Sequence, residues 1–185
     1  MITKNSIYKN IDDIHFKDIK CHFENFLDGE TGIDCSLVHK AKEENVLVSA
    51  VKLIDSNDNY DEVISRYILD IKHSFFFEHP KDHIPGLMLI EAGRQAGTLM
   101  SHVIYNVPLD HIFILDDIQV KFLNLANLES PIIAYNHIKD KKFKKNTLIS
   151  LIAEGYFFQD EKKIASIKST WRIINPRIFK RMSRK

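Results

Sequence analysis

The amino-acid sequence predicts an α+β domain in which one long helix packs against a curved antiparallel sheet. Two β-branched and apolar segments precede a single long apolar helix, and four more strand-like segments follow it. This order differs from the regular strand–helix alternation that is typical of a parallel sheet. Short polar turns between the later segments favour antiparallel pairing, because antiparallel strands can be joined by very short connections.

The first part of the chain is weakly patterned, and we expect residues 1–33 to form an N-terminal extension. Residues 46–54 are rich in β-branched and apolar side chains and predict the first strand. Residues 55–59 are polar and supply a turn, after which residues 63–69 predict the second strand. An aromatic run and a loop with two prolines then lead to the helix.

The predicted helix begins at Pro85 and Gly86 and runs to about Tyr105. Proline is favoured in the first helical turn because its missing N–H has no partner within the helix there. Apolar residues lie on nearly all sides, which predicts a helix that is buried on most sides. Gly93 and Gly97 lie one turn apart, and we expect them to let another backbone approach closely.

Four strands are predicted after the helix, at residues 112–123, 131–138, 148–158 and 163–174, with turns at 124–130 and 140–145. The two strands before the helix, the helix and these four strands make one domain, which we place at residues 34–176. Residues 177–185 are then a basic C-terminal tail.

The composition of the chain argues against several classes of protein. The chain has 185 residues, enough for one domain with a sizeable core, and its net charge of +1 argues against a dedicated nucleic-acid binder. No apolar stretch approaches the ~18–20 residues of a membrane-spanning helix, and the N-terminus has no secretory pattern. Cys21 and Cys35 form neither a CxxC motif nor a disulfide framework. We therefore expect a cytoplasmic protein with neither nucleic acid nor membrane as a partner.

The small net charge is an average over unlike parts of the chain. Residues 136–185 carry 14 basic and 4 acidic side chains, whereas residues 1–62 carry 7 basic and 13 acidic ones. Two explanations stay open for the basic part, a solvated turn with a frayed tail or a docking surface for an acidic partner protein. Lys141, Lys142 and Arg181 would belong to such a surface.

Polar side chains occur in the predicted buried helix, where apolar ones are expected. Glu91 lies in its second turn, and Arg94 and Gln95 follow at i+3 and i+4, so that the three share one face. A carboxylate in apolar surroundings has a raised pKa, which suits proton transfer near neutral pH. The alternative is an ordinary ion pair between Glu91 and Arg94.

A second polar group precedes the helix, where the chain can fold over the first helical turns. His79, Asp82 and His83 lie there, and the helix start offers free backbone N–H groups for an oxyanion. The two histidines suggest a metal site, but the neighbouring prolines oppose a helical presentation and a third soft ligand is not evident. We predict no metal. The run of phenylalanines at 75–77 is expected to pack in the core and in a dimer contact, or to wall an apolar tunnel.

These residues resemble the hotdog fold, and more closely its A-factor-biosynthesis family. The hallmark of that family is roughly histidine-proline, aspartate-histidine, proline-glycine, and then a helix with glutamate-alanine and arginine-glutamine. The corresponding pairs here are His79-Pro80, Asp82-His83, Pro85-Gly86, Glu91-Ala92 and Arg94-Gln95. Upstream, Leu37-Val38-His39-Lys40 and Glu44-Asn45-Val46 also resemble the start of the family's domain, so that the resemblance covers residues 34–174.

The resemblance implies an enzyme that acts on acyl thioesters. A β-ketoacyl group would pass from acyl carrier protein or CoA to the hydroxyl of a small, phosphorylated acceptor such as dihydroxyacetone phosphate, in the synthesis of a butyrolactone-type signal. Dehydration of a 3-hydroxyacyl thioester, thioester hydrolysis and non-catalytic acyl binding are the alternatives. No cofactor is implied beyond the carrier of the acyl group, and an acidic acyl carrier protein is then the partner expected to dock on the basic surface.

The resemblance also implies roles for single residues. Glu91, His79 or His83 would take the hydroxyl proton, and the helix start at Gly86 would hold the thioester oxygen. Arg94 or Lys81 would hold a phosphate, with Asp82 and Gln95 as further substrate-binding candidates. Typical butyrolactone enzymes carry two hotdog repeats and this chain has room for one. We therefore expect a homodimer with its site near the boundary between the copies.

Overall fold

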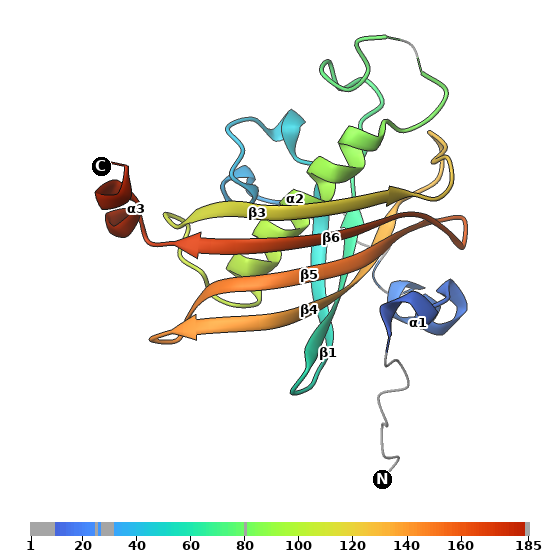
Figure 1. The fold of residues 1–185 in the computed structure, drawn as a ribbon. Coiled ribbons are helices and arrows are strands. Elements are labelled where there is room, and N and C mark those ends of the chain that lie inside the picture. Colours follow the sequence, from blue (N-terminus) through green and yellow to red (C-terminus); the bar gives the residue numbers. More distant parts are fainter. Residues whose placement is uncertain (1–9, 25, 27–31, 80, 184–185) are drawn as a thin grey trace.

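A single antiparallel sheet wraps around the long helix α2 (Gly86–Val103) in the computed structural model, which describes residues 10–24, 26, 32–79 and 81–183 (Figure 1). The sheet has six strands in the order β1-β2-β4-β5-β6-β3. Their bounds are β1 (Val48–Ser56), β2 (Tyr60–Tyr67), β3 (Ile112–Phe122), β4 (Ile133–Lys144), β5 (Thr147–Gln159) and β6 (Lys162–Ile174). The predicted α+β class and the order of its elements are confirmed.

The predicted turn at residues 140–145 is wrong, because β4 continues to Lys144. The turn consists of Lys145 and Asn146, whose φ angles are 49° and 63°. Asp160 and Glu161 join β5 to β6 with almost the same angles, 48° and 63°. Positive φ at both central residues matches the right-handed twist of the flanking strands, so both hairpins close tightly.

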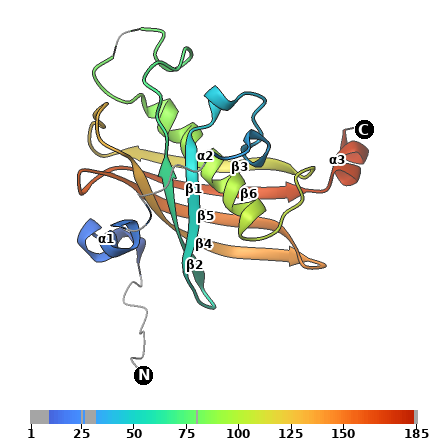
Figure 2. The same cartoon turned by 180° about the vertical axis from the view of Figure 1, so that it is seen from behind.

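Helix α2 crosses the concave face of the sheet (Figure 2). Its buried side chains form a core with residues of β2, β4, β5 and β6: Met88, Leu89, Ala92, Ala96 and Leu99 pack with Tyr67, Ala134, Phe157 and Ala165. The two helical glycines face side chains and not a neighbouring backbone, which corrects the expectation from sequence. A Cβ atom on Gly93 would lie 3.2 Å from Ile167 Cδ1, and one on Gly97 would lie 3.9 Å from the Trp171 ring.

The opposite face of the sheet is covered by residues from the predicted extension. Two short helices, η1 (Ile11–Asp13) and α1 (Phe16–Glu24), bury Ile11, Ile14, Ile19 and Phe23 against β2, β4 and β5. The sheet contributes Ile64, Ile133, Tyr135 and Phe158 to this second core. The described part of residues 1–33 is thus packed on the sheet, and the domain boundary at residue 34 stays a prediction.

Two short 3-10 helices, η2 (Cys35–Val38) and η3 (Glu43–Asn45), lead into β1, and η2 contacts α2. The basic segment after β6 begins with a short helix that the sequence analysis did not predict, α3 (Pro176–Met182). Asn175 caps this helix by accepting a hydrogen bond from the Arg177 backbone N–H. Across the described ranges, none of the helices has the length and apolar character to cross a membrane.

Candidate functional site

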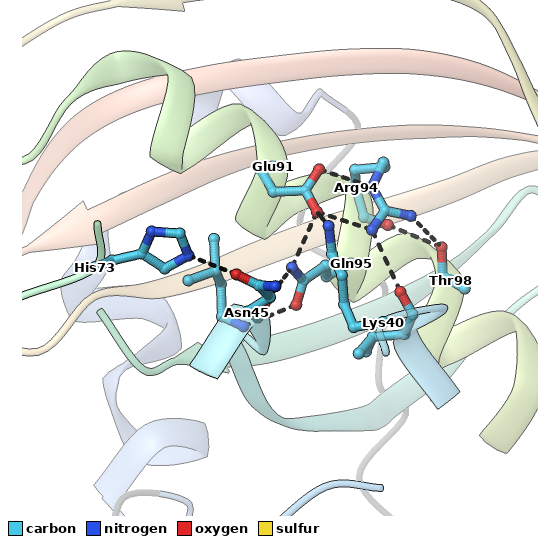
Figure 3. A network of polar contacts seen from close by, with 9 residues as sticks. Lys40, Asn45, His73, Glu91, Arg94, Gln95 and Thr98 are labelled. Carbon is cyan, nitrogen blue, oxygen red and sulfur yellow. Dashed lines mark hydrogen bonds and ion pairs between the residues drawn. The ribbon is translucent and has the colours of Figure 1, made fainter. Parts of the chain in front are cut away.

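Glu91 lies at the centre of a polar network on α2 (Figure 3). Arg94 binds its carboxylate with two hydrogen bonds of 2.8 Å, from Nε to Oε2 and from Nη2 to Oε1. The same guanidinium also donates to the Val38 carbonyl at 3.3 Å and to Thr98 Oγ1 at 3.5 Å. Because four acceptor atoms of three residues bind its guanidinium, the Arg94 side chain is held in one position.

Gln95 ties this network to the main chain upstream of β1. Its side chain is fully buried. The amide nitrogen donates to Glu91 Oε1 at 3.0 Å and to the Asn45 carbonyl at 2.8 Å. The amide oxygen accepts from the Leu47 backbone N–H at 2.7 Å. The predicted grouping of Glu91, Arg94 and Gln95 on one helix face is therefore present, and it anchors η3 on α2.

Lys40 supplies a second cation to Glu91, with 2.7 Å between Nζ and Oε1. Its position follows from the end of η2, where His39 adopts a left-handed conformation with φ 55°. The Lys40 N–H then bonds back to the Cys35 carbonyl at 2.9 Å, as is common where a helix ends in this conformation. The reversal of the chain brings the Lys40 side chain over α2.

The charge state of Glu91 differs from the expectation based on burial. Burial raises the pKa of Glu91, but hydrogen bonds from Arg94, Lys40 and Gln95 outweigh it and hold the pKa at about 2. The carboxylate is thus ionised at neutral pH and is a weak base while all three donors remain bound. Burial does raise the pKa of Glu91 as expected, but the three hydrogen-bond donors lower it by more.

Asn45 and His73 extend the network, and the sequence analysis gave neither a role at the site. A hydrogen bond of 3.0 Å joins His73 Nε2 to Asn45 Oδ1. Lys40 and Asn45 stand in the upstream segments that resemble the family, so a signal for them was present in the sequence. His73 stands outside the quoted motif and carried no such signal.

The other predicted site residues lie apart from Glu91. His79 is exposed. His83 Nδ1 and Asp82 Oδ1 are 2.7 Å apart in the loop that leads from β2 to α2 (Figure 1). Lys81 is half-buried in the same loop. In the described parts of the chain, no hydrogen bond or ion pair joins this group of loop residues to Glu91.

Gly86 starts α2 under the ring of Phe122. A Cβ atom at this position would come within 2.5 Å of Phe122 Cζ, so the close packing of the helix start on β3 requires glycine or a shift of the ring. Pro85 is the N-cap, and no side chain caps the first turn. The first backbone N–H groups of α2 therefore have no side-chain acceptor.

Glu91 lines two cavities. The outer pocket, of about 460 Å³, lies between α2, η3 and the loop after β2, and it is lined by Lys40, Asn45, His73, Phe75, Phe76, Leu87, Ile90 and Glu91. The inner cavity, of about 90 Å³, lies between α2 and the sheet, and its apolar lining includes Leu115, Ile118, Phe157, Ile167 and Trp171. Ile90 and Glu91 line both. A third pocket, of about 430 Å³, lies beside η1 and has none of these site residues in its lining.

The basic residues predicted to dock a carrier protein differ in exposure and in ion pairing. Lys141 forms an ion pair of 2.5 Å with the buried Asp61, which holds its side chain at the end of the sheet. Lys142 and Arg181 are exposed. Docking of a carrier protein to this region stays a prediction. Within the described ranges, no cluster of three or more histidine, cysteine, aspartate or glutamate side chains is arranged to hold a metal ion.

Comparison with known proteins identifies both the family and the fold. The model of the A-factor biosynthesis hotdog domain family matches residues 24–175. A curated relative, the 2-oxo-3-(phosphooxy)propyl 3-oxoalkanoate synthase of Streptomyces coelicolor, is 30% identical over 73 residues, which are 40% of this chain and 21% of that protein. The synthase of the same name from Streptomyces griseus is 40% identical over 42 residues, 23% of this chain and 14% of that protein. The matched part is thus about a fifth of these relatives' length or less.

Among solved structures, a Lactococcus lactis protein described as a thioesterase superposes with a TM-score of 0.56 at 14% sequence identity, over 74% of this chain and 99% of that one. A likeness at this level of identity shows the fold alone, which is the hotdog fold.

Proposed function

Because the chain belongs to the family of A-factor biosynthesis hotdog domains, we propose that it transfers an acyl group from a thioester to the hydroxyl of a small, phosphorylated acceptor. The curated relatives are named as synthases of a 3-oxoalkanoate ester that carries a phosphooxy group. The acyl group would come from acyl carrier protein or CoA, in butyrolactone-type biosynthesis.

The observation that carries this proposal is the position of Glu91 in the walls of both the outer pocket and the inner cavity. The outer pocket has polar groups from Lys40, Asn45 and His73 and suits a small polar acceptor. The inner cavity has a mostly apolar lining and a volume of about 90 Å³, which suits the first carbons of the acyl chain. An acceptor hydroxyl and a thioester carbonyl would then meet beside the carboxylate.

The reaction forms a bond between the acceptor oxygen and the carbonyl carbon and breaks the carbon–sulfur bond, so that the products are an ester and a thiol. Glu91 would take the hydroxyl proton during attack and return it to the departing sulfur. The uncapped N–H groups at the start of α2 would stabilise the negative charge that develops on the carbonyl oxygen. Arg94 would keep the carboxylate oriented, since both of its hydrogen bonds to Glu91 are 2.8 Å long.

We further propose that two copies associate through β3, which is an edge strand of the sheet. Exposed apolar side chains follow this edge and the loop after it: Leu115, Ile118, Phe122, Leu123 and Leu125. An exposed apolar edge strand is a template for pairing with another chain. Leu115 and Ile118 also line the inner cavity, so a second copy on this edge would help to close it.

Mass spectrometry of the acyl group tests the proposed reaction. The protein is mixed with a 3-oxoacyl carrier protein, with and without dihydroxyacetone phosphate. We expect release from the carrier that depends on the acceptor and yields a phosphorylated ester, and this activity should be lost in Glu91→Gln. Release at the same rate without acceptor would indicate hydrolysis, and tight retention without turnover would indicate an acyl-binding protein. Either result would contradict the proposal.

A further inference from the structure

The candidate site holds one more positive charge than Glu91 needs. Arg94 alone forms the paired hydrogen bonds that satisfy a carboxylate, one to each oxygen. Lys40 is a second cation on the same group, 2.7 Å from Oε1. Two cations on a single carboxylate leave a net charge of +1 at the wall of the outer pocket, which favours the binding of an anion there.

The two cations differ in their freedom to change partner. Arg94 is held by Glu91, the Val38 carbonyl and Thr98. The Lys40 ammonium has three donors, and within the described residues its only ion pair is with Glu91. Its side chain is 27% exposed and sits on a flexible four-carbon stem. Lys40 can therefore turn toward a ligand while Arg94 stays in place.

The outer pocket has room for a small, phosphorylated molecule. Its volume of about 460 Å³ lies within the usual range of ligand pockets, and Lys40 and Glu91 both line it. His73 is the other residue of this lining that can carry positive charge, and its Nε2 is bonded to Asn45. Lys40 is thus the cation of this lining that has further N–H donors available for a ligand.

We propose that Lys40 couples acceptor binding to catalysis: the acceptor's phosphate takes the ammonium group away from Glu91, and the carboxylate then accepts the acceptor's hydroxyl proton. This inference rests on the proposed acyl transfer and names the feature that the acceptor must carry, an anionic group. An uncharged alcohol such as glycerol would leave Lys40 on Glu91 and would be a poor acceptor.

This transfer of the Lys40 ammonium from Glu91 to the phosphate also explains how a carboxylate with a low pKa can serve as a base. The Lys40 hydrogen bond is one of the causes that hold the pKa of Glu91 at about 2. When that donor leaves, burial acts against fewer opposing contacts and the pKa rises. Glu91 therefore becomes a stronger base in the presence of the phosphorylated acceptor, which protects the thioester from attack by water when the acceptor is absent.

Binding of sn-glycerol 3-phosphate and of glycerol, measured by isothermal titration calorimetry, tests the anion site without requiring turnover. For sn-glycerol 3-phosphate we expect Lys40→Gln to weaken binding by about tenfold or more, the loss of one charge-assisted contact, and Lys40→Arg to retain most of the affinity. Lys42→Gln is the matched control, because Lys42 is exposed and pairs only with Glu44 in the described residues. Glycerol should not bind measurably to any of the variants.

The coupling itself is read from the titration of the Glu91 carboxyl carbon by NMR. Saturation with sn-glycerol 3-phosphate should raise the pKa of Glu91 in the native protein and leave it unchanged in Lys40→Gln. Equal phosphate binding by the native protein and Lys40→Gln, or a Glu91 titration that the ligand does not move, would overturn the inference. If acyl transfer to the phosphorylated acceptor proceeds equally in Lys40→Gln, the inference fails and the proposed function stands. If Lys40-dependent binding and the change in the pKa of Glu91 occur without any acyl transfer, the proposed function fails, and only the displacement of Lys40 by an anionic ligand stands.

Discussion

Replacing Glu91 by glutamine tests the electrostatic description of the site through protein stability. The pKa of Glu91 is about 2 in the folded protein and ordinarily 4.5, because its donors outweigh the effect of burial. A pKa lower by about 2.5 corresponds to about 3 kcal/mol of stabilisation of the folded state. Since the folded state favours the ionised form, this stability is complete above about pH 5 and is lost as the pH falls toward 2.

Urea unfolding of the native protein and of Glu91→Gln, at pH 7 and at pH 3, measures this contribution. The variant should be less stable by about 3 kcal/mol at pH 7. At pH 3 the difference should fall to about 1 kcal/mol, because Glu91 is then protonated in the unfolded chain and still mostly ionised in the folded one. Glu44→Gln is the control. Glu44 is 64% exposed and pairs with Lys42, so its loss should cost less than about 1 kcal/mol at either pH.

Parallel pH dependence for the native protein and Glu91→Gln would refute this reasoning, because it would mean that the pKa of Glu91 is the same in the folded and unfolded chain. Equal stability at pH 7 would refute it as well. The other carboxyl groups titrate in both proteins and cancel in the comparison.

Three further predictions concern the fold and the assembly. Gly155→Ala should lower the Tm in differential scanning fluorimetry by about 3–10 °C, because the new Cβ atom would lie 2.1 Å from Asn136 Oδ1. Gly32→Ala is the control and should leave the Tm nearly unchanged, because no atom of the other described residues lies within 4 Å of the Cβ position there. Phe23→Ala should cost about 3–5 kcal/mol in urea unfolding, since this ring is 1% exposed under the sheet; a loss below about 1 kcal/mol would show that the covering segment does not contribute to the fold. Light scattering should show a dimer that Ile118→Lys converts to a monomer, and a native protein that is already monomeric would contradict the proposed association.

The polar face of α2 was predictable because helix geometry is local. Residues three and four positions apart share a face, so the sequence alone places Glu91, Arg94 and Gln95 together. The groups that set the charge state of Glu91 were not predictable in this way. Lys40 lies in a distant segment, and Gln95 is oriented by the Asn45 carbonyl 50 positions upstream. A burial argument based on one helix therefore predicted the opposite pKa shift.

The errors at the ends of elements have a similar cause. A polar, lysine-rich run suits both a turn and the exposed end of a twisted strand, and in this protein Lys141 is held there by Asp61 of the neighbouring strand. Helix α1 escaped prediction because it is short and has only two buried residues, Ile19 and Phe23, whose partners lie in the sheet. In both cases the deciding contacts join parts of the chain that are far apart in sequence.

The sheet contains hairpins between strands that are close in sequence and two pairings, β2 with β4 and β3 with β6, between strands that are not. β4, β5 and β6 follow one another through tight hairpins, whereas β3 pairs with β6, from Ile112 with Ile174 to Phe122 with Ala165. Closing a short loop costs less chain entropy than closing a long one, so we expect the three-stranded meander of β4, β5 and β6 to form first and β3 to pair with it afterwards. Pulsed hydrogen exchange should then protect amides of β5 before those of β3. The strand that exposes an apolar edge would thus reach its final shape only after the meander has formed, which shortens the time in which that edge can nucleate aggregation.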